Sequence, residues 1–406
     1  MMIKTKNFAP FLVFSVYFIS VYIGFALNYN SPRIWANDSQ NLFLLYKNQI
    51  LFTQVIFYMT VFGSYLIHQL VTKQKPTVAH DQNCENKLNV YAIITGGLGS
   101  ALLMIWCLRN GISIGDYSRF WEIRRQVGVV EISLANSLFW VCCASMMLIR
   151  KHSRYHTLII LLFLTLPLAL GLRNFVLIPI FLLSIQRFFN AQRKSQITIA
   201  GVMVLLIVTS LAIGTFRNAK DTKDTSNYLD EICRELNSSN IAMARSIHLE
   251  NHYGIESDAA KHYFNGLLVS IPKGSSFFSI ESEFTPFNTL LIKYFNKWKY
   301  KYGQTEGGSI VAESLYYLGY PGLILVAMSF GVMLSWCSNT SGSTAEISII
   351  KYMLIFLLTW GMRNSLIDIL KPLILATSFL LILNGSYWLI GQMACRLTPS
   401  KNEFTN

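Results

Sequence analysis

The amino-acid sequence is dominated by apolar runs of roughly 20 residues that are almost free of charge. A helical run of this length matches the roughly 30 Å hydrocarbon core of a bilayer, and a helix satisfies its own backbone hydrogen bonds in lipid. With 52% hydrophobic and 14% charged residues, the chain is too apolar for a soluble globule. The sequence therefore predicts an all-α polytopic integral membrane protein with about ten transmembrane helices. The predicted spans are residues 9–27, 49–71, 88–107, 131–149, 156–172, 174–189, 197–214, 308–336, 348–362 and 372–392.

The positive charges of the short connecting segments predict the orientation of these helices, because such segments carry excess Lys and Arg on the cytoplasmic side. One side collects Lys4, Lys6, Lys73, Lys75, Lys87, Arg150, Lys151, Arg154, Arg187, Arg193, Lys194, Arg396 and Lys401. We therefore expect both termini to be cytoplasmic, and we interpret the first run as a retained helix rather than a cleaved signal peptide.

The same orientation divides the chain into three parts: a membrane domain over residues 1–216, a large outer loop over 217–306, and a second membrane domain over 307–406. The loop's 11 basic and 11 acidic residues cancel, so the net charge of +13 belongs to the membrane part and indicates no nucleic-acid partner. The loop is predicted to be mainly helical, with helix starts at Ser226, Ser257 and Thr285. The last of these helices is basic and amphipathic, so it packs either on the outer leaflet or on the other loop helices.

Arginine followed by asparagine recurs at the outer ends of the predicted helices. The four pairs are Arg109-Asn110, Arg173-Asn174, Arg217-Asn218 and Arg363-Asn364. Residues 156–189 are too long for one span, and each half is short, so we expect a hairpin at Gly171–Asn174 that sets Arg173 at the floor of an outward-facing cavity. Helix capping is one explanation for these pairs, because Asn tolerates the left-handed C-cap and Arg complements the helix dipole.

Capping does not explain why the cations gather at the outer ends, where the positive-inside trend disfavours them. Arg119, Arg124 and Arg125 add to the same outer surplus. A planar guanidinium group can bind a phosphate through two parallel hydrogen bonds. The sequence therefore predicts an outer anion site for a phosphate or pyrophosphate.

Few acids and histidines are placed for acid–base chemistry. Glu313 is predicted about two turns inside the helix of 308–336, and an intramembrane carboxylate is a functional candidate. Asp368 lies between Arg363 and Lys371, where pairing with an arginine is a structural alternative. The loop histidines and one loop lysine are substrate-binding or proton-accepting candidates: His248, His252, His262 and Lys293. Without clustered acids, the histidines are expected to be solvated rather than metal-bound.

The segment "GGSIVAESLYYLGYPGLI", preceded by "SIPKG", resembles the O-antigen polymerase (Wzy-type) family. That family opens a late helix with a Gly-rich stretch, a Glu and a Tyr-x-x-Gly step, after a large periplasmic loop. The resemblance covers most of the chain in organisation and about 20 residues in motif. The arginine-x10-glycine repeats of some members are absent from this chain.

The resemblance implies a glycosyltransferase of lipopolysaccharide biosynthesis at the periplasmic face of the bacterial inner membrane. Its substrate would be an undecaprenyl-pyrophosphate-linked glycan, in contact with membrane lipid, and its partners a chain-length regulator and a flippase. Arg173, Arg217 and Arg363 would stabilise the departing pyrophosphate without cofactor or metal, and Glu313 or a loop histidine would accept the proton. An O-antigen ligase and a lipid-linked oligosaccharide flippase or transporter remain alternatives with a similar layout.

Overall fold

The computed structural model describes most of the chain, and the regular structure in those residues is entirely helical. It describes residues 9–30, 37–72, 82–113, 119–120, 123, 130–149, 154–170, 184, 188, 195–201, 228–254, 258–271, 285–297, 308–339 and 343–397. The helices are α1 (Ala9–Asn28), α2 (Asn37–Val71), α3 (Gln82–Arg109), α5 (Val130–Leu148), α6 (Arg154–Ala169), α9 (Tyr228–Tyr253), α10 (Ala259–Ser270), α12 (Phe287–Phe295), α14 (Ile310–Ser338), α15 (Ala345–Gly361) and α16 (Leu366–Leu397).

Six of these helices are long and apolar enough to cross a membrane. The candidate spans are Pro10–Asn28, Gln40–Val71, Cys84–Arg109, Glu131–Leu148, Ile310–Ser338 and Leu366–Tyr387. The all-α fold is thus confirmed for the described residues. The remaining predicted spans differ: α6 and α15 form where expected but are 16 and 17 residues long, and residues 174–189 and 197–214 lie largely outside the described ranges.

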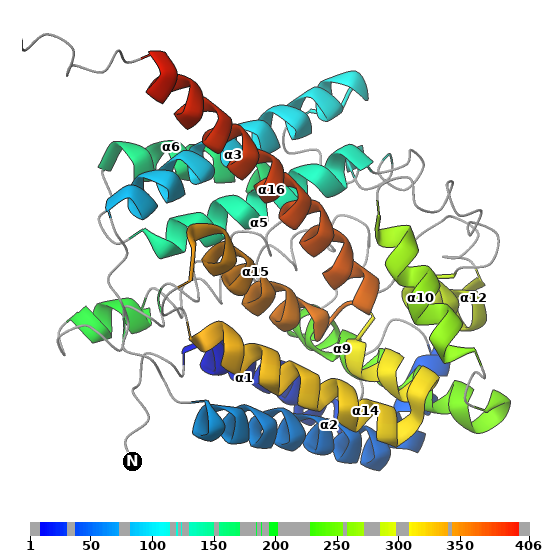
Figure 1. The fold of residues 1–406 in the computed structure, drawn as a ribbon. Helices are drawn as coiled ribbons and strands as arrows, with labels where there is room; N and C mark the ends of the chain where they lie inside the picture. Colours follow the sequence, from blue (N-terminus) through cyan, green and yellow to red (C-terminus); the bar gives the residue numbers. More distant parts are fainter. Residues whose placement is uncertain are drawn as a thin grey trace, which may run out of the picture.

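The helices form two groups that a central pair connects (Figure 1). Helices α1, α2, α9 and α14 pack together on one side, and α3, α5 and α6 on the other. Helix α15 contacts both α14 and α5, and α16 contacts α5 and α10. The short helices α10 and α12 lie together at the right of Figure 1, beside the ends where α14 and α16 begin.

Helices α2 and α14 run side by side in close contact. His68 Nδ1 lies 2.7 Å from Ser335 Oγ, and Thr53 Oγ1 lies 3.2 Å from the Tyr320 hydroxyl. Gly331 makes the approach possible, because a Cβ at this position would lie 2.3 Å from the carbonyl oxygen of Val61. Backbones that approach this closely at a glycine are typical of membrane helix pairs.

Helix α9 belongs to the predicted outer loop, yet it packs against α1, α2 and α14. Its polar side chains reach backbone groups of those neighbours. Asn240 donates to the Val21 carbonyl at 3.1 Å and accepts a bond from Gln54, while Ser246 donates to the Ala312 carbonyl at 2.6 Å. The described loop helices therefore stand in direct contact with the candidate spans, whereas the predicted domain boundaries at 216/217 and 306/307 fall outside the described residues.

Helix α12 is expected from the sequence to pack either on the outer leaflet or on the other loop helices. Its first turns pack on protein, and the helix contacts α9. Phe287 and Leu291 are buried against protein, while Lys293 is exposed. Its N-cap is Pro286 rather than the predicted Thr285, and the Pro286 carbonyl accepts the first helical bonds. A shift of one residue at a helix end is common.

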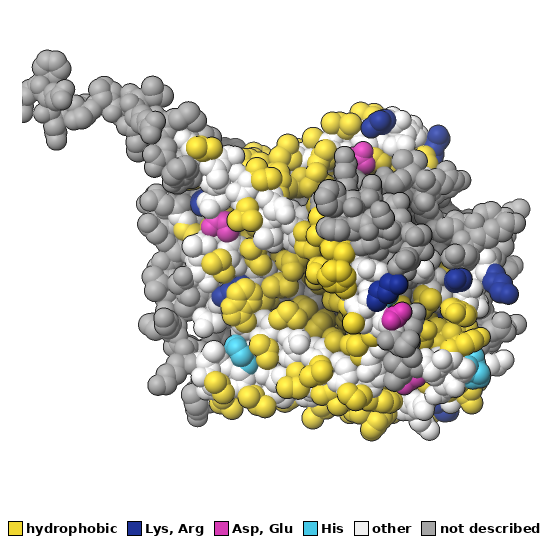
Figure 2. Space-filling view, turned by 45° about the vertical axis from the view of Figure 1, so that its right-hand side comes forward, with side chains coloured by type: hydrophobic (Ala, Val, Ile, Leu, Met, Phe, Trp, Pro, Cys, Tyr) yellow, Lys and Arg dark blue, Asp and Glu magenta, His cyan; other side chains and the backbone are white. Residues whose placement is uncertain are grey.

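The outer surface carries many hydrophobic side chains, as a membrane protein requires. Figure 2 shows them over much of one face, while charged side chains are few. Large exposed apolar residues include Leu45 and Phe52 on α2, Leu108 on α3 and Leu325 on α14.

Candidate functional site

The motif segment forms the first part of α14 and ends in a break. Ser309 caps the helix by accepting a bond from the Val311 amide at 3.2 Å. Gly319 then adopts φ 63° and ψ −168°, a conformation essentially restricted to glycine. The glycine of the Tyr-x-x-Gly step therefore allows a short helix, Ile310–Leu318, to join a long one at an angle.

This break changes the position predicted for Glu313. Glu313 lies in the first turn of α14, not two turns inside it. The stretch after the break, Tyr320–Ser338, measures about 28 Å at 1.5 Å per residue. That length alone nearly matches the thickness of the hydrocarbon core.

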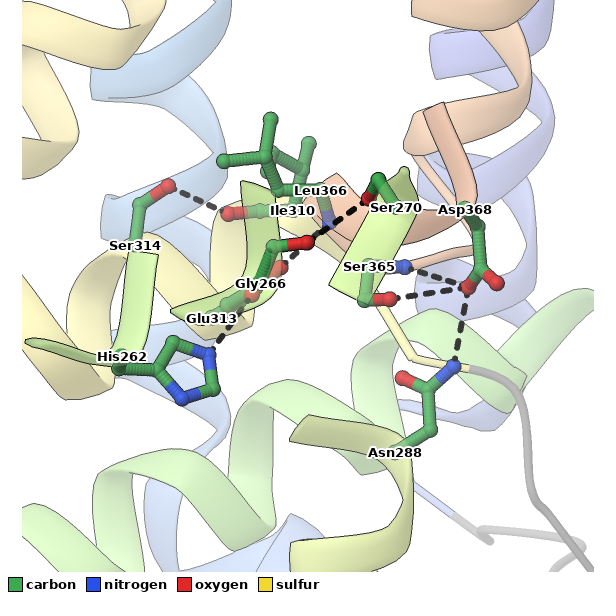
Figure 3. Close-up of polar contacts among 10 residues, drawn as sticks. All are labelled: His262, Gly266, Ser270, Asn288, Ile310, Glu313, Ser314, Ser365, Leu366 and Asp368. Atoms are coloured by element: carbon green, nitrogen blue, oxygen red, sulfur yellow. Dashed lines mark hydrogen bonds and ion pairs between the residues drawn. The ribbon is translucent and has the colours of Figure 1, made fainter. Parts of the chain in front are cut away.

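The Glu313 carboxylate is fully buried and held at both oxygens (Figure 3). Its exposed fraction is 0%. Oε2 accepts a bond from the backbone amide of Leu366 at 2.7 Å, and Oε1 lies 3.3 Å from Nε2 of His262. Leu366 is the first residue of α16, so the carboxylate also faces the positive end of a helix. Glu313 thus connects α14, α16 and α10.

A second carboxylate caps the same helix end. Asp368 Oδ2 accepts bonds from the Ser365 amide at 3.1 Å and from the Ser365 hydroxyl at 2.9 Å. A serine at the N-cap with an acid three residues later is a capping-box arrangement. Asn288 of α12 donates to the same oxygen at 3.3 Å. Asp368 is therefore a structural group that ties α12 to α16.

His262 corrects the expectation that the loop histidines are solvated. Its side chain is buried, and its ring stacks on Tyr317 with centroids 3.8 Å apart and planes at 18°. Burial, together with the nearby Glu313 carboxylate, raises the pKa of the neighbouring Tyr263. A histidine held against a buried carboxylate by an aromatic ring is a fixed acid–base pair rather than a surface group.

The chemistry of this arrangement follows from its bonds. A carboxylate with both oxygens engaged does not itself reach a substrate, but it orients the histidine and stabilises the protonated imidazole. The His262–Glu313 pair can therefore accept a proton as a unit. Because Glu313 lies in the motif and His262 in the loop, the pair exists only when the loop packs on the membrane helices.

Arg363 is the predicted arginine that lies nearest in sequence to Leu366, whose amide binds Glu313. It lies in the turn between α15 and α16, three residues before Leu366, and its Nη2 donates to Ser238 Oγ of α9 at 2.7 Å. It is partly exposed. A guanidinium at this turn can offer donors to an anion beside the His262–Glu313 pair.

The other predicted site residues are distributed more widely. Arg109, the last residue of α3, and Arg119 beyond it are exposed, and Lys293 is exposed on α12. The rings of His248 and His252 lie against each other near the end of α9, with centroids 3.9 Å apart and planes tilted by 38°. None of these residues bonds to Glu313, whose partners are His262 and Leu366. Arg124, Arg125, Arg173 and Arg217, like the predicted hairpin at 171–174, lie outside the described residues.

Sequence reasoning did not identify two residues that shape this region. Arg245 of α9 is only 3% exposed, with its guanidinium carbon 5.5 Å from the centre of the Phe295 ring. Tyr317 supports the His262 ring. The double Tyr316-Tyr317 in the motif was a visible signal for the second, whereas nothing local to Arg245 marks its burial.

Comparisons with protein-family models, with curated proteins and with solved structures found no match for this chain.

Proposed function

We propose that this protein is a glycosyltransferase that polymerises undecaprenyl-pyrophosphate-linked oligosaccharide repeat units at the periplasmic face of the bacterial inner membrane. One observation carries the proposal. The glutamate of the motif that resembles the polymerase family, Glu313, is buried against His262 of the loop that follows the same family layout. Motif and loop thus meet in one acid–base site, as an enzyme requires.

The reaction joins an acceptor hydroxyl to the anomeric carbon of the growing glycan. The hydroxyl oxygen forms the new bond, the carbon–oxygen bond to the pyrophosphate breaks, and its electron pair leaves with the pyrophosphate. The hydroxyl proton passes to the His262–Glu313 pair, with Glu313 acting as a positioning residue. Arg363 supports the charge that develops on the leaving group, with Arg173 and Arg217 as proposed partners. No cofactor is required for this step.

A transporter is the second candidate, because the break at Gly319 resembles the discontinuous helices of secondary transporters. Those breaks lie near the bilayer midplane. Here the break follows the first nine residues of a 29-residue helix. Glu313, which belongs to the buried acid–base pair, lies on the N-terminal side of the break. This position favours a reaction at the membrane surface over a substrate site at mid-depth.

Deleting the gene and separating the lipopolysaccharide by gel distinguishes the candidates. A polymerase deletion leaves core with one repeat unit. A ligase deletion leaves bare core together with accumulated lipid-linked polymer. A flippase deletion leaves bare core with repeat units held on the cytoplasmic side. Only the first outcome supports the proposal.

A matched pair of variants then tests the site. Glu313→Gln should keep the protein in the membrane and abolish the polymer ladder, because the amide keeps the shape and removes the basicity. Glu346→Gln is the control. Glu346 lies in the first turn of α15, at the end of that helix opposite to the turn that carries Arg363, and it pairs with Lys87. A normal ladder from Glu313→Gln, or equal loss from both variants, would contradict the role of Glu313.

A further inference from the structure

A second group of side chains lies where α9 and α12 end, apart from Glu313. We call it the aromatic patch: His248, His252, Tyr253, Tyr294 and Phe295. The ring centroids of Tyr253 and Tyr294 are 5.6 Å apart. The Tyr253 side chain is 69% exposed and that of Tyr294 is 45% exposed. The His248 ring lies 3.9 Å from that of His252 and 5.8 Å from that of Phe295.

Neighbouring groups, two of them buried, contact several rings of the patch. The hydroxyl of Tyr46, which is 8% exposed, lies 3.2 Å from Nδ1 of His248. His252 Nδ1 lies 2.9 Å from the His248 carbonyl oxygen. The buried Arg245 guanidinium packs on the Phe295 ring. Contacts from α2 and within α9 thus position the rings of His248, His252 and Phe295 before any ligand arrives, which lowers the entropy lost on binding.

The aromatic patch and the Glu313 site lie beside opposite ends of the short helix α12. The first residue of α12, Phe287, packs its ring 6.1 Å from Tyr316 and 6.0 Å from Tyr317. The last residue, Phe295, belongs to the patch, and eight residues at 1.5 Å each span about 12 Å. Ser246 of α9, two residues before His248, bonds to the carbonyl beside Glu313. The spacing suits a short oligosaccharide whose reacting end lies at Glu313.

The chemistry of the patch selects one part of a lipid-linked glycan. A pyrophosphate prefers guanidinium and ammonium groups, and an acyl or prenyl tail prefers a continuous apolar surface. The patch instead combines aromatic faces with hydrogen-bonding edges. Asn251 and Lys293 are exposed near its tyrosines in sequence, and the Arg245 guanidinium beneath Phe295 is buried rather than open to a ligand. Sugar rings match this combination, because they present polarised C–H groups to the negative face of an aromatic ring and hydroxyls at their rim.

We propose that the aromatic patch binds sugar rings of the lipid-linked repeat unit while the pyrophosphate end lies near Glu313 and Arg363. This assignment rests on the proposed polymerase function, and it names the glycan, rather than the lipid or the pyrophosphate, as what α9 and α12 recognise. His248 and His252 are then sugar-binding residues.

The test uses the full-length protein in lipid nanodiscs. The probe is the lipid-free repeat-unit oligosaccharide released from the host strain's own lipopolysaccharide, and binding is followed by calorimetry and by saturation-transfer NMR. Tyr253→Ala and Tyr294→Ala should each weaken binding by roughly three- to tenfold, the effect expected for one aromatic contact. Phe264→Ala is the matched control, because Phe264 is an aromatic residue on α10 that is 59% exposed and lies outside the patch. Its affinity should equal that of the unsubstituted protein.

A second readout separates this proposal from the polymerase proposal. In chain-extension assays, the two tyrosine variants should raise the KM for the lipid-linked repeat and leave kcat unchanged, because they remove binding common to substrate and transition state. If the protein extends chains but the tyrosine variants bind oligosaccharide normally, the patch assignment is wrong and the polymerase proposal stands. If no chain is extended yet binding falls in the tyrosine variants only, the patch is a sugar site and the polymerase proposal fails.

The remaining outcomes overturn the patch assignment. Absence of oligosaccharide binding by the unsubstituted protein is one of them. Another is quenching of a Tyr253→Trp variant by brominated lipid, without quenching protection from the oligosaccharide, because it would place the ring in the membrane interface, where Tyr and Trp are also enriched.

Discussion

At the residue scale, two of the four Arg-Asn pairs can be explained in part by helix capping. Asn110 and Asn364 each donate a side-chain bond to the carbonyl of the tryptophan four residues earlier, at 2.7 Å and 2.9 Å. Capping by Asn was predictable, although its detail differs: Gly111, not Asn110, carries the positive φ after α3. The two arginines differ in their surroundings: Arg109 is exposed, whereas Arg363 bonds to Ser238, 125 residues away along the chain. Local sequence does not reveal such a partner.

Arg363 can be tested against a purely structural role. If it binds pyrophosphate as a planar fork, Arg363→Lys should restore only part of the polymer that Arg363→Ala loses, because lysine offers a point charge. Ser238→Ala removes the partner on α9 and keeps the guanidinium, so it should retain most of the polymer. The measurement is the polymer ladder normalised to membrane protein. Normal polymer in both arginine variants, or equal loss in Ser238→Ala, would leave Arg363 as a link between α9 and the α15–α16 turn.

His248 predicts a pH dependence of stability. Burial, and then the nearby His252, lowers its pKa below the value of about 6.5 for an unfolded chain. The unfolded state therefore binds more protons between the two pKa values, and stability rises with pH there. This contribution is complete above about pH 6.5 and is lost as the pH falls through the folded pKa. Thermal unfolding in nanodiscs between about pH 7.5 and pH 5 should show a smaller fall for His248→Gln. Parallel curves for both proteins would refute the assignment.

At the element scale, the break in α14 is the feature that positions the site. The sequence carries glycine, tyrosine and proline at this point, but the pattern predicts one continuous helix over 308–336 and not the break at Gly319. Gly319 provides the turn, while Gly322 is required for another reason: a Cβ there would lie 2.0 Å from that of Leu318. Helix α9 was less predictable, because its polar composition favours a solvated loop helix. Its burial depends on distant partners such as Val21 and Gln54.

Gly319→Ala tests the break. Any residue with a Cβ is strained at this φ and ψ, at a cost of roughly 1–3 kcal/mol, so the thermal midpoint should fall and the polymer ladder should shorten. Gly385→Ala is the control, because Gly385 lies in α16 with no atom within 4 Å of an added Cβ. Alanine favours helix over glycine, so this variant should be as stable as the unsubstituted protein or more so. Equal stability of the two variants would show that the break is not required.

At the scale of the whole molecule, apolar runs of bilayer length locate the long helices, because bilayer thickness fixes their length. Six predicted spans form as helices of sufficient length. The same reasoning could not place the loop helices, whose packing depends on pairs such as His262 with Glu313 and Asn288 with Asp368. Glu313 was identified as a functional candidate from its position in an apolar helix. The sequence predicts a solvated histidine for its partner, His262, because no local signal brings residues 51 positions apart together.

The orientation of the molecule remains a prediction that reporter fusions can test. A phosphatase fused within residues 258–271 should be active, because the positive charges place that segment outside. Fusions after Lys75 and Lys194 should be inactive. The reverse pattern would put the His262–Glu313 pair on the cytoplasmic side and exclude a periplasmic reaction.

The proposed reaction depends on His262 and Glu313 acting as one proton-accepting unit in glycan transfer. The direct measurement is chain extension by the purified protein in nanodiscs with the lipid-linked repeat unit, comparing His262→Gln, Glu313→Gln and the double variant. Each single variant should lose roughly 10²–10⁴-fold in rate, and the double variant should lose no more than the worse single one, because members of one unit are not additive. Full activity in either single variant, or losses that multiply in the double variant, would contradict the account.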